Sequence, residues 1–416
     1  MKTLATALSY LLFWTAFPFL ATHPKLRSGF RQRLGLHPKL PPSDSPRIWL
    51  HGASAGDISA LRPTALELKV QEPNVEIILS TVTDSGYAMA HKLSPLFDRI
   101  IYQPYDLPGS VGRALDRLAP SVLVLEYTEL WPQLIYAAKS RSIPVLLHNG
   151  RFSAASMGRY KLLFSIAGNL LSPLTALLLR DEHEAERARV LGASPDRILV
   201  TGNTKFDNLQ APPKPAEIDA LREAFGFGPD DLIWLAGSTH EGEENELLKV
   251  FKQLRQEFPS LRMVIAPRYL ERLDRVAAMV KRHGLTCRRR TKPGAPADVG
   301  LLDTVGELST CYGLGTVVFV GGSFVKRGGQ NILEPAGCGR PVVFGPYMRN
   351  FPDSVKVLLG RGGLQVATPE KLSEVLGELL HRPDYREELG ELARIQVQLA
   401  RGAAARNAEA ILKGLP

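Results

Sequence analysis

The stretch TVVFVGGSFVKRGGQNILEPAGCGRPVVFGP, which spans Thr316–Pro346, decides how the rest of this sequence is interpreted. Its two ends, Thr316–Val320 and Pro341–Phe344, are continuous apolar runs of the kind that form parallel strands buried on both faces of a sheet. Neighbouring parallel strands need a crossover connection, so we expect a helix between the two runs. The stretch therefore predicts an α/β fold.

A glycine-rich, polar turn separates these two strands. Its glycines let the backbone approach a ligand closely, and they stand at Gly321, Gly322, Gly328 and Gly329. Asn331 suits the N-cap of the expected helix, and Glu334 follows within the first turn. Exposed N–H groups at a helix start suit a phosphate, and a carboxylate suits the paired hydroxyls of a ribose. The pattern fits a nucleotide site, and it equally fits a capped turn that binds nothing.

Length and composition indicate a folded protein with two domains. A chain of 416 residues can build two cores, and its 44% hydrophobic and 22% charged residues exclude a disordered or fibrous protein. Lysine and arginine exceed aspartate and glutamate by 51 to 42, so nucleic acid, anionic lipid or a phosphorylated substrate all fit as partners. The three cysteines, Cys287, Cys311 and Cys338, lack disulfide or metal-ligand spacing, which indicates a reducing compartment.

The start of the chain predicts a membrane anchor at residues 1–24. Leu4–Thr22 is uncharged, apolar and nearly long enough to cross a bilayer. Only Lys2 precedes it, and the basic residues that follow it are Lys25, Arg27, Arg31, Arg33 and Lys39. The positive-inside rule then keeps the following body in the cytoplasm. A cleaved signal peptide is the rival interpretation, and Pro18 leaves open whether the segment spans the membrane or lies along its surface.

Alternating strand and helix patterns predict two parallel sheets covered by helices on both faces. The first set of strands is expected at Arg47–Ala53, Val75–Thr81, Arg99–Tyr105, Val122–Tyr127, Pro144–Asn149, Ala176–Arg180 and Ile198–Thr201. The second set is expected at Leu232–Ala236, Arg262–Ala266, Leu285–Arg290, Val299–Leu302, Thr316–Val320 and Pro341–Phe344.

Residues 209–217 are proline-rich and separate the two sets as a linker. The domains are thus expected at 40–208 and at 218–416. A final helical stretch, Tyr385–Leu412, either stays with the second domain or packs back on the first.

Ligands of open parallel sheets bind beyond the carboxyl ends of the strands, so residues there carry the functional predictions. Asp57 ends the segment HGASAGD after the first strand. It is either an acid at a helix N-terminus, stabilised by the dipole, or a general base for a sugar hydroxyl. Glu129, after the fourth strand, is likewise either an acid beside a helix that begins at Pro132 or a site residue.

Other strand ends offer donors and cations. His148, Asn149, Gly150 and Arg151 follow the fifth strand, and Lys205 follows the seventh. In the segment GSTHEGEE, Ser238, Thr239 and the early backbone amides can cradle a phosphate, whereas Glu241 and Glu243 only cap the helix. Arg268 directly follows a strand, with a solvated surface arginine as the alternative, and Arg288–Arg290 is interpreted as a solvated strand or a lipid-facing patch.

Taken in order, a series of segments carries a family resemblance. They are HGASAGD, STVTDSGY, PYDLP, TELWP, NGRFS, GNTKFD, STHEGEE, APR with the following Glu271 and Arg272, GELSTCYG, and VGGSFVKRGGQNILEPA. Together they resemble the 3-deoxy-D-manno-octulosonic acid (Kdo) transferases, membrane-associated glycosyltransferases of lipopolysaccharide biosynthesis. The resemblance implies the GT-B fold, in which two doubly wound parallel-sheet domains face a cleft.

The resemblance also implies an activity, which is inverting transfer of Kdo from CMP-Kdo to a lipid A precursor, lipid IVA. The N-terminal domain would bind the acceptor and the C-terminal domain CMP-Kdo, without a metal ion, another cofactor or nucleic acid. The expected location is the bacterial inner membrane, with the catalytic body on its cytoplasmic face and against its anionic surface.

The family's catalytic base falls on Asp57, where the family usually has glutamate. On an unchanged backbone, the shorter side chain would hold its carboxylate about an ångström further from the acceptor hydroxyl, which can cost about a hundredfold in rate. The acceptor and sugar would also meet Ser54, Gly56, Glu129, Arg151, Lys205 and Lys326. The last three are candidates to hold the Kdo carboxylate.

The resemblance places CMP on residues of the second domain, namely Ser238, Thr239, His240, Pro267, Arg268, Gly306, Glu307, Leu308, Gly321, Gly322, Ser323, Asn331 and Glu334. Backbone amides and Arg268 would meet the phosphate, Glu334 the ribose, and the turn Gly306–Leu308 the cytosine base. Lys326 and Gln330 stand where relatives carry an acid and a histidine, so the contacts to the sugar are less defined than those to the nucleotide.

Two other functions are compatible with the sequence. One is a glycosyltransferase that uses a UDP-linked donor, because such an enzyme would share the fold and the ribose-binding glutamate. The other is a catalytically weak, membrane-bound relative that binds nucleotide or lipid, which the departure at Asp57 motivates.

Overall fold

The structure is a computed structural model that describes residues 10, 11, 13–15, 17, 28–292 and 294–415. Most of the predicted anchor at 1–24 lies outside the described residues. Within the described part, no helix combines the length and the apolar character needed to cross a bilayer.

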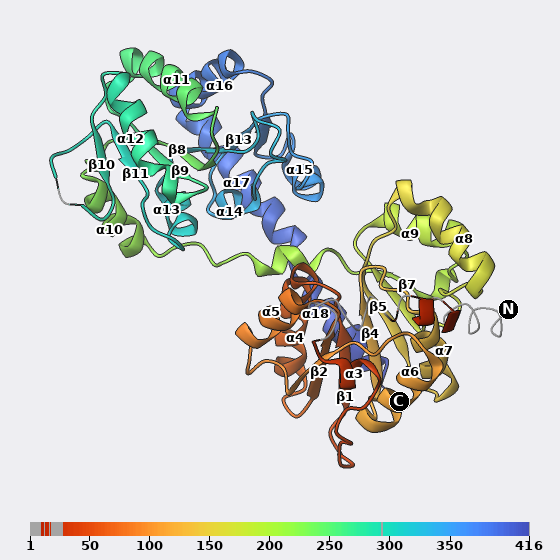
Figure 1. Cartoon of the computed structure of the whole chain (residues 1–416). Helices are drawn as coiled ribbons and strands as arrows, with labels where there is room; N and C mark the ends of the chain where they lie inside the picture. Colours follow the sequence, from red (N-terminus) through yellow and green to blue (C-terminus); the bar gives the residue numbers. More distant parts are fainter. Residues whose placement is uncertain (1–9, 12, 16, 18–27, 293, 416) are drawn as a thin grey trace. The chain divides into compact units, whose positions relative to one another are not determined.

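The chain divides by its contacts into two units (Figure 1). Unit 1 is Met1–Asn208 with Arg401–Pro416, and unit 2 is Leu209–Ala400. The predicted linker at 209–217 therefore falls within unit 2, where helix α10 (Pro215–Phe225) already begins. The second domain was predicted to run to 416, with a terminal helix that either stays there or packs back on the first domain, and the contacts assign the last residues to unit 1.

Unit 1 is built on a parallel sheet of seven strands in the order β3-β2-β1-β4-β5-β6-β7. These are β1 (Arg47–His51), β2 (Glu76–Thr81), β3 (Arg99–Tyr102), β4 (Val122–Glu126), β5 (Val145–Gly150), β6 (Ala176–Leu179) and β7 (Ile198–Val200). All the strands predicted for this half are confirmed. The helices are α3 (Phe30–Arg33), α4 (Ala55–Gln71), α5 (Asp84–Lys92), α6 (Pro108–Leu118), α7 (Pro132–Ser140), α8 (Met157–Ala167), α9 (Glu182–Val190) and α18 (Ala403–Lys413), with short 3-10 turns that include η3 (Thr204–Asn208).

The core of unit 1 lies on both faces of this sheet. Alternate residues of β1 point to opposite faces, so Ile48 and Leu50 share one cluster with residues of α4 and α18, while Trp49 joins another with residues of α6 and α7. Strands that are covered on both faces are apolar at nearly every position. These strands could therefore be predicted from continuous apolar runs in the sequence.

Unit 2 repeats the plan, with seven parallel strands in the order β10-β11-β9-β8-β12-β13-β14. They are β8 (Leu232–Thr239), β9 (Leu261–Pro267), β10 (Cys287–Arg289), β11 (Val299–Leu301), β12 (Val317–Val320), β13 (Val342–Phe344) and β14 (Gly363–Gln365), the last of which was not predicted. Its helices are α10, α11 (Glu244–Glu257), α12 (Leu273–Arg282), α13 (Leu308–Leu314), α14 (Leu333–Gly337), α15 (Pro352–Leu358), α16 (Pro369–His381) and α17 (Pro383–Ala400). The two doubly wound sheets expected from the sequence are thus present.

The final helical stretch is two helices rather than one, because the backbone turns between α17 and α18 at Gly402, which has a φ of 84°. The Asp207 carboxylate fixes this turn by accepting bonds from the amides of Gly402, at 2.6 Å, and Ala404, at 2.8 Å. Beyond it, α18 places Ala408 and Ile411, both fully buried, in the core of unit 1. The end of the chain therefore completes the sheet domain that its beginning started (Figure 1).

Replacing Ile411 with alanine should lower the free energy of unfolding by about 2–5 kcal/mol, because it leaves a cavity between α18 and the sheet. Urea unfolding followed by circular dichroism measures the loss. Leu399→Ala is the control, since Leu399 is 72% exposed and its truncation should change little. Equal effects of the two substitutions would contradict a structural role for α18.

Candidate functional site

Asp57 lies in the first turn of α4, directly after β1, and its side chain makes the contacts of a helix cap. Its Oδ2 accepts bonds from the backbone amide of Ser54 at 2.8 Å and from the Ser54 hydroxyl at 2.9 Å, so it does cap the helix start. Its Oδ1 accepts no bond from the described residues. The close turn depends on Gly52, where a Cβ would come within 2.9 Å of the Asp57 Cβ. One oxygen is therefore held and the other is available to a ligand.

Glu129 is held beside the end of β1. Its Oε2 accepts a bond from the Trp131 indole at 3.1 Å and lies 3.8 Å from Nε2 of the buried His51. The His51 Nδ1 in turn bonds with the Ser80 hydroxyl at 2.8 Å. The side chain of Glu129 remains 28% exposed, so this carboxylate is oriented by its neighbours without being enclosed.

Two of the donors predicted after the fifth strand are used inside the protein. The buried carboxylate of Glu126 accepts a bond from Asn149 Nδ2 at 3.1 Å and makes a short contact with His148 Nδ1. The other ring nitrogen of His148 bonds with the Thr64 hydroxyl at 2.8 Å. His148 and Asn149 are both fully buried, so they shape the end of β5 instead of meeting a ligand.

Tyr127 was missed by the sequence analysis, because an aromatic residue after an apolar strand looks like core. It follows β4 with a φ of 53°, a left-handed conformation that a tyrosine rarely adopts. Its ring carries the Arg180 guanidinium 4.5 Å from the ring centroid and the Lys205 ammonium at 5.6 Å. Its hydroxyl is buried without a hydrogen-bond partner in the described structure.

The charges around Tyr127 connect the predicted residues of unit 1. Its pKa is raised, chiefly by burial and then by the charge of Glu126. Asp57 raises it further, while Arg180 and Arg151 lower it. Asp57 and Arg151, predicted from two separate strand ends, thus act through their charges on the side chain over which Lys205 lies. Arg151 and Lys205 are exposed at this site.

In unit 2, a buried carboxylate organises the glycine-rich turn. Glu243 is 1% exposed, and its Oε2 accepts bonds from the amides of His240 at 2.9 Å and Gly322 at 2.7 Å. Its Oε1 accepts from the amides of Ser323 at 3.0 Å and Phe324 at 2.9 Å. Burial raises the pKa of this carboxyl, and the four amide bonds oppose that shift.

This arrangement changes the interpretation of the predicted phosphate cradle. The amides of Gly322 and Ser323 donate to Glu243, and the amide of Gly321 donates to the Gly237 carbonyl at 2.8 Å. A carboxylate of the protein therefore occupies the amides of Gly322 and Ser323, two of the residues predicted to bind CMP. Glu243 stands at the N-cap position of α11, as one interpretation held, but its side chain makes no hydrogen bond to the helix amides. It instead holds the turn that follows the distant strand β12.

The next residue, Glu244, is fully buried and fixes a second strand end. Arg272 pairs with it through two bonds, from Nη1 at 2.8 Å and from Nη2 at 3.0 Å. The Thr239 hydroxyl donates to the same carboxylate at 3.0 Å. These bonds use the Thr239 side chain that was predicted to meet CMP. They also bring together two of the segments that carry the resemblance, because Glu244 ends STHEGEE and Arg272 follows APR.

The remaining residues predicted for CMP lie at the carboxyl ends of β8, β9, β11 and β12 or in the segments after them. Arg268 is exposed after Pro267 at the end of β9, and its guanidinium has no partner among the described residues. His240 is 5% exposed, its Nε2 is unpaired in the described structure, and burial lowers its pKa. In the turn Gly306–Leu308, Glu307 accepts a bond from Arg290 at 2.7 Å, so the run at 288–290 has a structural role there.

Asn331 and Glu334 are brought together as expected. The N-cap of α14 is Ile332, one residue later than predicted, and the Asn331 Oδ1 accepts from the Leu333 amide at 3.1 Å. Asn331 Nδ2 donates to Glu334 at 2.9 Å, and burial raises the pKa of Glu334. Tyr312 was not predicted from the sequence; its buried hydroxyl bonds with Ser238, and its ring fills the space above Gly237.

One further predicted cation lies in the turn after β12. Lys326 is exposed in the glycine-rich turn and unpaired within the described structure. Among the residues described, no cluster of three or more His, Cys, Asp or Glu side chains could hold a metal ion.

Two doubly wound parallel sheets with polar strand ends define the GT-B fold. A glycosyltransferase from Rickettsia africae ESF-5 matches with a TM-score of 0.58 at 12% identity, over 90% of this chain and 99% of that one. At this identity the likeness shows the fold alone.

Sequence comparison identifies the family. The family model described as 3-Deoxy-D-manno-octulosonic-acid transferase (kdotransferase) matches residues 28–208. A 3-deoxy-D-manno-octulosonic acid transferase of Haemophilus influenzae is 32% identical over 92% of this chain and 90% of its own length, and one of Bordetella pertussis is 31% identical over 88% and 86%. The chain therefore belongs to the 3-deoxy-D-manno-octulosonic acid transferase family, as the sequence motifs predicted.

Replacing Glu243 with glutamine should lower the free energy of unfolding of unit 2 by about 2–4 kcal/mol. The glutamine NH₂ would face two backbone amides and leave buried donors unpaired, at about 1–3 kcal/mol each. Urea unfolding measures the effect. Glu241→Gln is the matched control, because Glu241 is exposed in the same segment. Equal stability of the two variants would show that Glu243 does not hold the turn.

Proposed function

We propose that this protein transfers Kdo from CMP-Kdo to a lipid A precursor, with inversion at the anomeric carbon. Membership of the Kdo transferase family supports the reaction class. The observation that carries the mechanism is the Asp57 carboxylate, whose Oδ2 is fixed by Ser54 while Oδ1 is left without a partner among the described residues. A carboxylate held in this way can take a proton from a sugar hydroxyl.

The proposed step is a direct displacement. Asp57 removes the proton of the acceptor hydroxyl while the oxygen of that hydroxyl forms a bond to the anomeric carbon of Kdo. The bond from that carbon to the phosphate oxygen breaks, and CMP leaves with the electron pair. Attack from the side opposite the leaving group inverts the configuration, and no metal ion takes part in this scheme.

Unit 2 would hold the nucleotide. Glu334 would bind the ribose hydroxyls, with Asn331 orienting its carboxylate, and the turn Gly306–Leu308 would face the cytosine. Because Glu243 occupies the amides of Gly322 and Ser323, negative charge on the departing phosphate would be stabilised by the exposed Arg268 and by helix-start amides that Glu243 does not bind. Lys326 is a further candidate, for the phosphate or for the Kdo carboxylate.

Unit 1 would hold the acceptor and the sugar. Ser54 and Gly56 form the start of α4 beside Asp57, and Arg151 and Lys205 supply positive charge around Tyr127. We place the catalytic body at the cytoplasmic face of a bacterial inner membrane, where its acceptor and an anionic surface would be available.

Purified protein should bind CMP in preference to UDP, and a preference for UDP would instead favour the alternative of a UDP-linked donor.

Replacing Asp57 with asparagine should reduce transfer by about 10²–10⁴-fold, the usual contribution of a general base. Mass spectrometry of the product formed from CMP-Kdo and tetraacylated lipid A precursor measures the rate. Asparagine can still accept the Ser54 amide bond, so stability should be nearly unchanged and a folding defect can be excluded by thermal unfolding.

The variant Asp57→Glu tests the reach of the carboxylate, because it restores the residue usual in the family. If the native protein and the Asp57→Asn variant were equally inactive while Asp57→Glu was active, the native protein would be a binding relative rather than an enzyme.

Replacing Tyr127 with phenylalanine should separate ligand contact from packing. The buried hydroxyl has no partner in the described structure, so its removal should leave the melting temperature unchanged or raise it. If the hydroxyl serves a ligand, transfer should fall by about tenfold or more, since one lost hydrogen bond to a charged group has that effect. Tyr127→Leu also removes the ring beneath Arg180, so it should reduce transfer more than Tyr127→Phe does. Full activity of the phenylalanine variant would confine Tyr127 to packing.

A further inference from the structure

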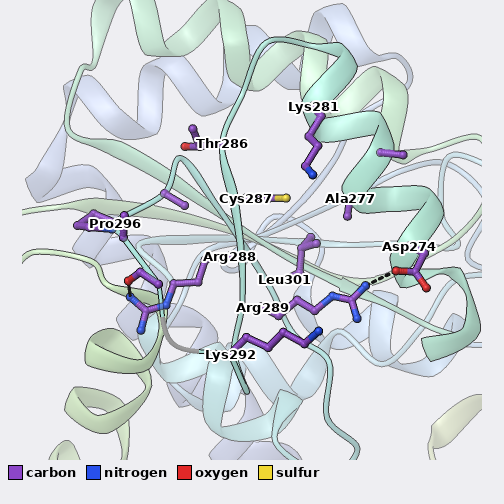
Figure 2. Close-up of a pocket in the computed structure, with 14 residues that line it drawn as sticks. Asp274, Ala277, Lys281, Thr286, Cys287, Arg288, Arg289, Lys292, Pro296 and Leu301 are labelled. Atoms are coloured by element: carbon purple, nitrogen blue, oxygen red, sulfur yellow. Dashed lines mark hydrogen bonds and ion pairs between the residues drawn. The ribbon is translucent and has the colours of Figure 1, made fainter.

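A basic pocket lies at the outer edge of the sheet of unit 2, between α12 and β10 (Figure 2). Its volume is about 580 Å³. The α12 wall consists of Asp274, Ala277, Ala278 and Lys281, which share one face of that helix by their spacing. The two alanines leave the space open, because larger side chains at this spacing would pack against the strand.

The charges in this pocket are unbalanced. Its lining holds the four cations Lys281, Arg288, Arg289 and Lys292 against the single acid Asp274. Asp274 pairs with Arg289 at 2.5 Å, but its side chain is 92% exposed, so this ion pair contributes little. Neither lysine ammonium has a partner among the described residues. Repulsion between neighbouring cations is relieved when an anion binds among them.

The floor of the pocket is apolar. Leu301 of the neighbouring strand β11 is fully buried beneath it, and Cys287 and Ala277 are half-buried on either side. Figure 2 shows Lys281 reaching from α12 toward Cys287, while Arg289 extends to Asp274. Arg288 also lines the pocket, but its Nη1 donates to the Gly294 carbonyl at 2.9 Å. Apolar floor and cationic rim together suit an anion attached to an apolar group.

This pocket is distinct from the predicted nucleotide site. In the sheet, β11 and β9 lie between β10 and β8, whose end carries Ser238 and Thr239. Along the chain, Arg290 turns away to Glu307, and Thr291 bonds through its amide with Asp303 at 3.1 Å. The cationic run at 288–290 is therefore divided. Arg288 and Arg289 line the pocket, whereas Arg290 binds Glu307 in the turn Gly306–Leu308.

We propose that the basic pocket binds the phosphate of a ligand that also carries an apolar group, with Lys281, Arg289 and Lys292 as the phosphate ligands. Lysine and arginine bind phosphate by charge-assisted hydrogen bonds, and the surface of Ala277 and Ala278 receives the apolar part. The ligand is either a soluble phosphate ester or the headgroup of an anionic phospholipid. This inference is independent of the reaction proposed above.

The half-buried thiol of Cys287 provides the test. Full-length protein is alkylated with iodoacetamide, and peptide mass spectrometry separates Cys287 from Cys311 and Cys338. The rate at Cys287 is measured alone, with phenyl phosphate, with phosphatidylglycerol vesicles and with phosphatidylcholine vesicles. Binding should slow the alkylation of Cys287 several-fold. Protection by phenyl phosphate identifies a soluble ester as sufficient, whereas protection by phosphatidylglycerol vesicles alone identifies the lipid headgroup.

Variants make the test specific to the pocket. The double substitution Lys281→Gln and Lys292→Gln should weaken binding of the protecting ligand by about tenfold or more, as expected for the loss of charge-assisted contacts. Arg275→Gln with Arg282→Gln is the matched control, because both arginines are exposed on α12 outside the pocket lining. Ala278→Leu fills the pocket without removing charge and should also abolish protection. The proposal is overturned if no probe slows alkylation, or if the control pair loses as much protection as the lysine pair.

Discussion

The buried carboxylate of Glu243 is the interaction on which the candidate donor site depends. A carboxylate is costly to bury, and here four backbone amides compensate for the loss of water. Those amides belong to the end of β8 and to the turn after β12, so one side chain ties together two neighbouring strand ends. The glycines of that turn matter in this context because Gly322, with a φ of 67°, lets the backbone wrap the carboxylate.

Unit 1 uses the same principle with a different residue. Glu126 is fully buried at the end of β4, and it binds His148 and Asn149 at the end of the neighbouring β5. Around both buried carboxylates the backbone adopts left-handed conformations at non-glycine residues, at Tyr127, Asn149 and Ser238. Such conformations cost about 1–3 kcal/mol each and persist where the surroundings impose them. In both units, then, internal acids hold the strand ends in shapes that leave other polar groups directed outward.

Much of the fold could be predicted because buried parallel strands appear in the sequence as apolar runs. β14 could not, since Gly363–Gln365 has only three residues and no such run. The break between α17 and α18 was hidden in an alanine- and arginine-rich stretch that looks helical throughout. In the site, topology located Asp57 and Arg268, but not the partner of Glu243. Gly322 is 79 residues further along the chain, and local patterns carry no information on contacts at that separation.

The return of α18 to unit 1 has a consequence for the order of events during synthesis. Residues 1–208 leave the ribosome without Ala408 and Ile411, which complete their core. At about 5–20 residues per second, translation of Leu209–Ala400 takes about ten to forty seconds, during which unit 2 can fold and unit 1 cannot close. The half that emerges first therefore finishes last. Apolar surface of α4 and β1 stays open in the nascent chain, where a chaperone or the membrane itself can cover it until the terminus arrives.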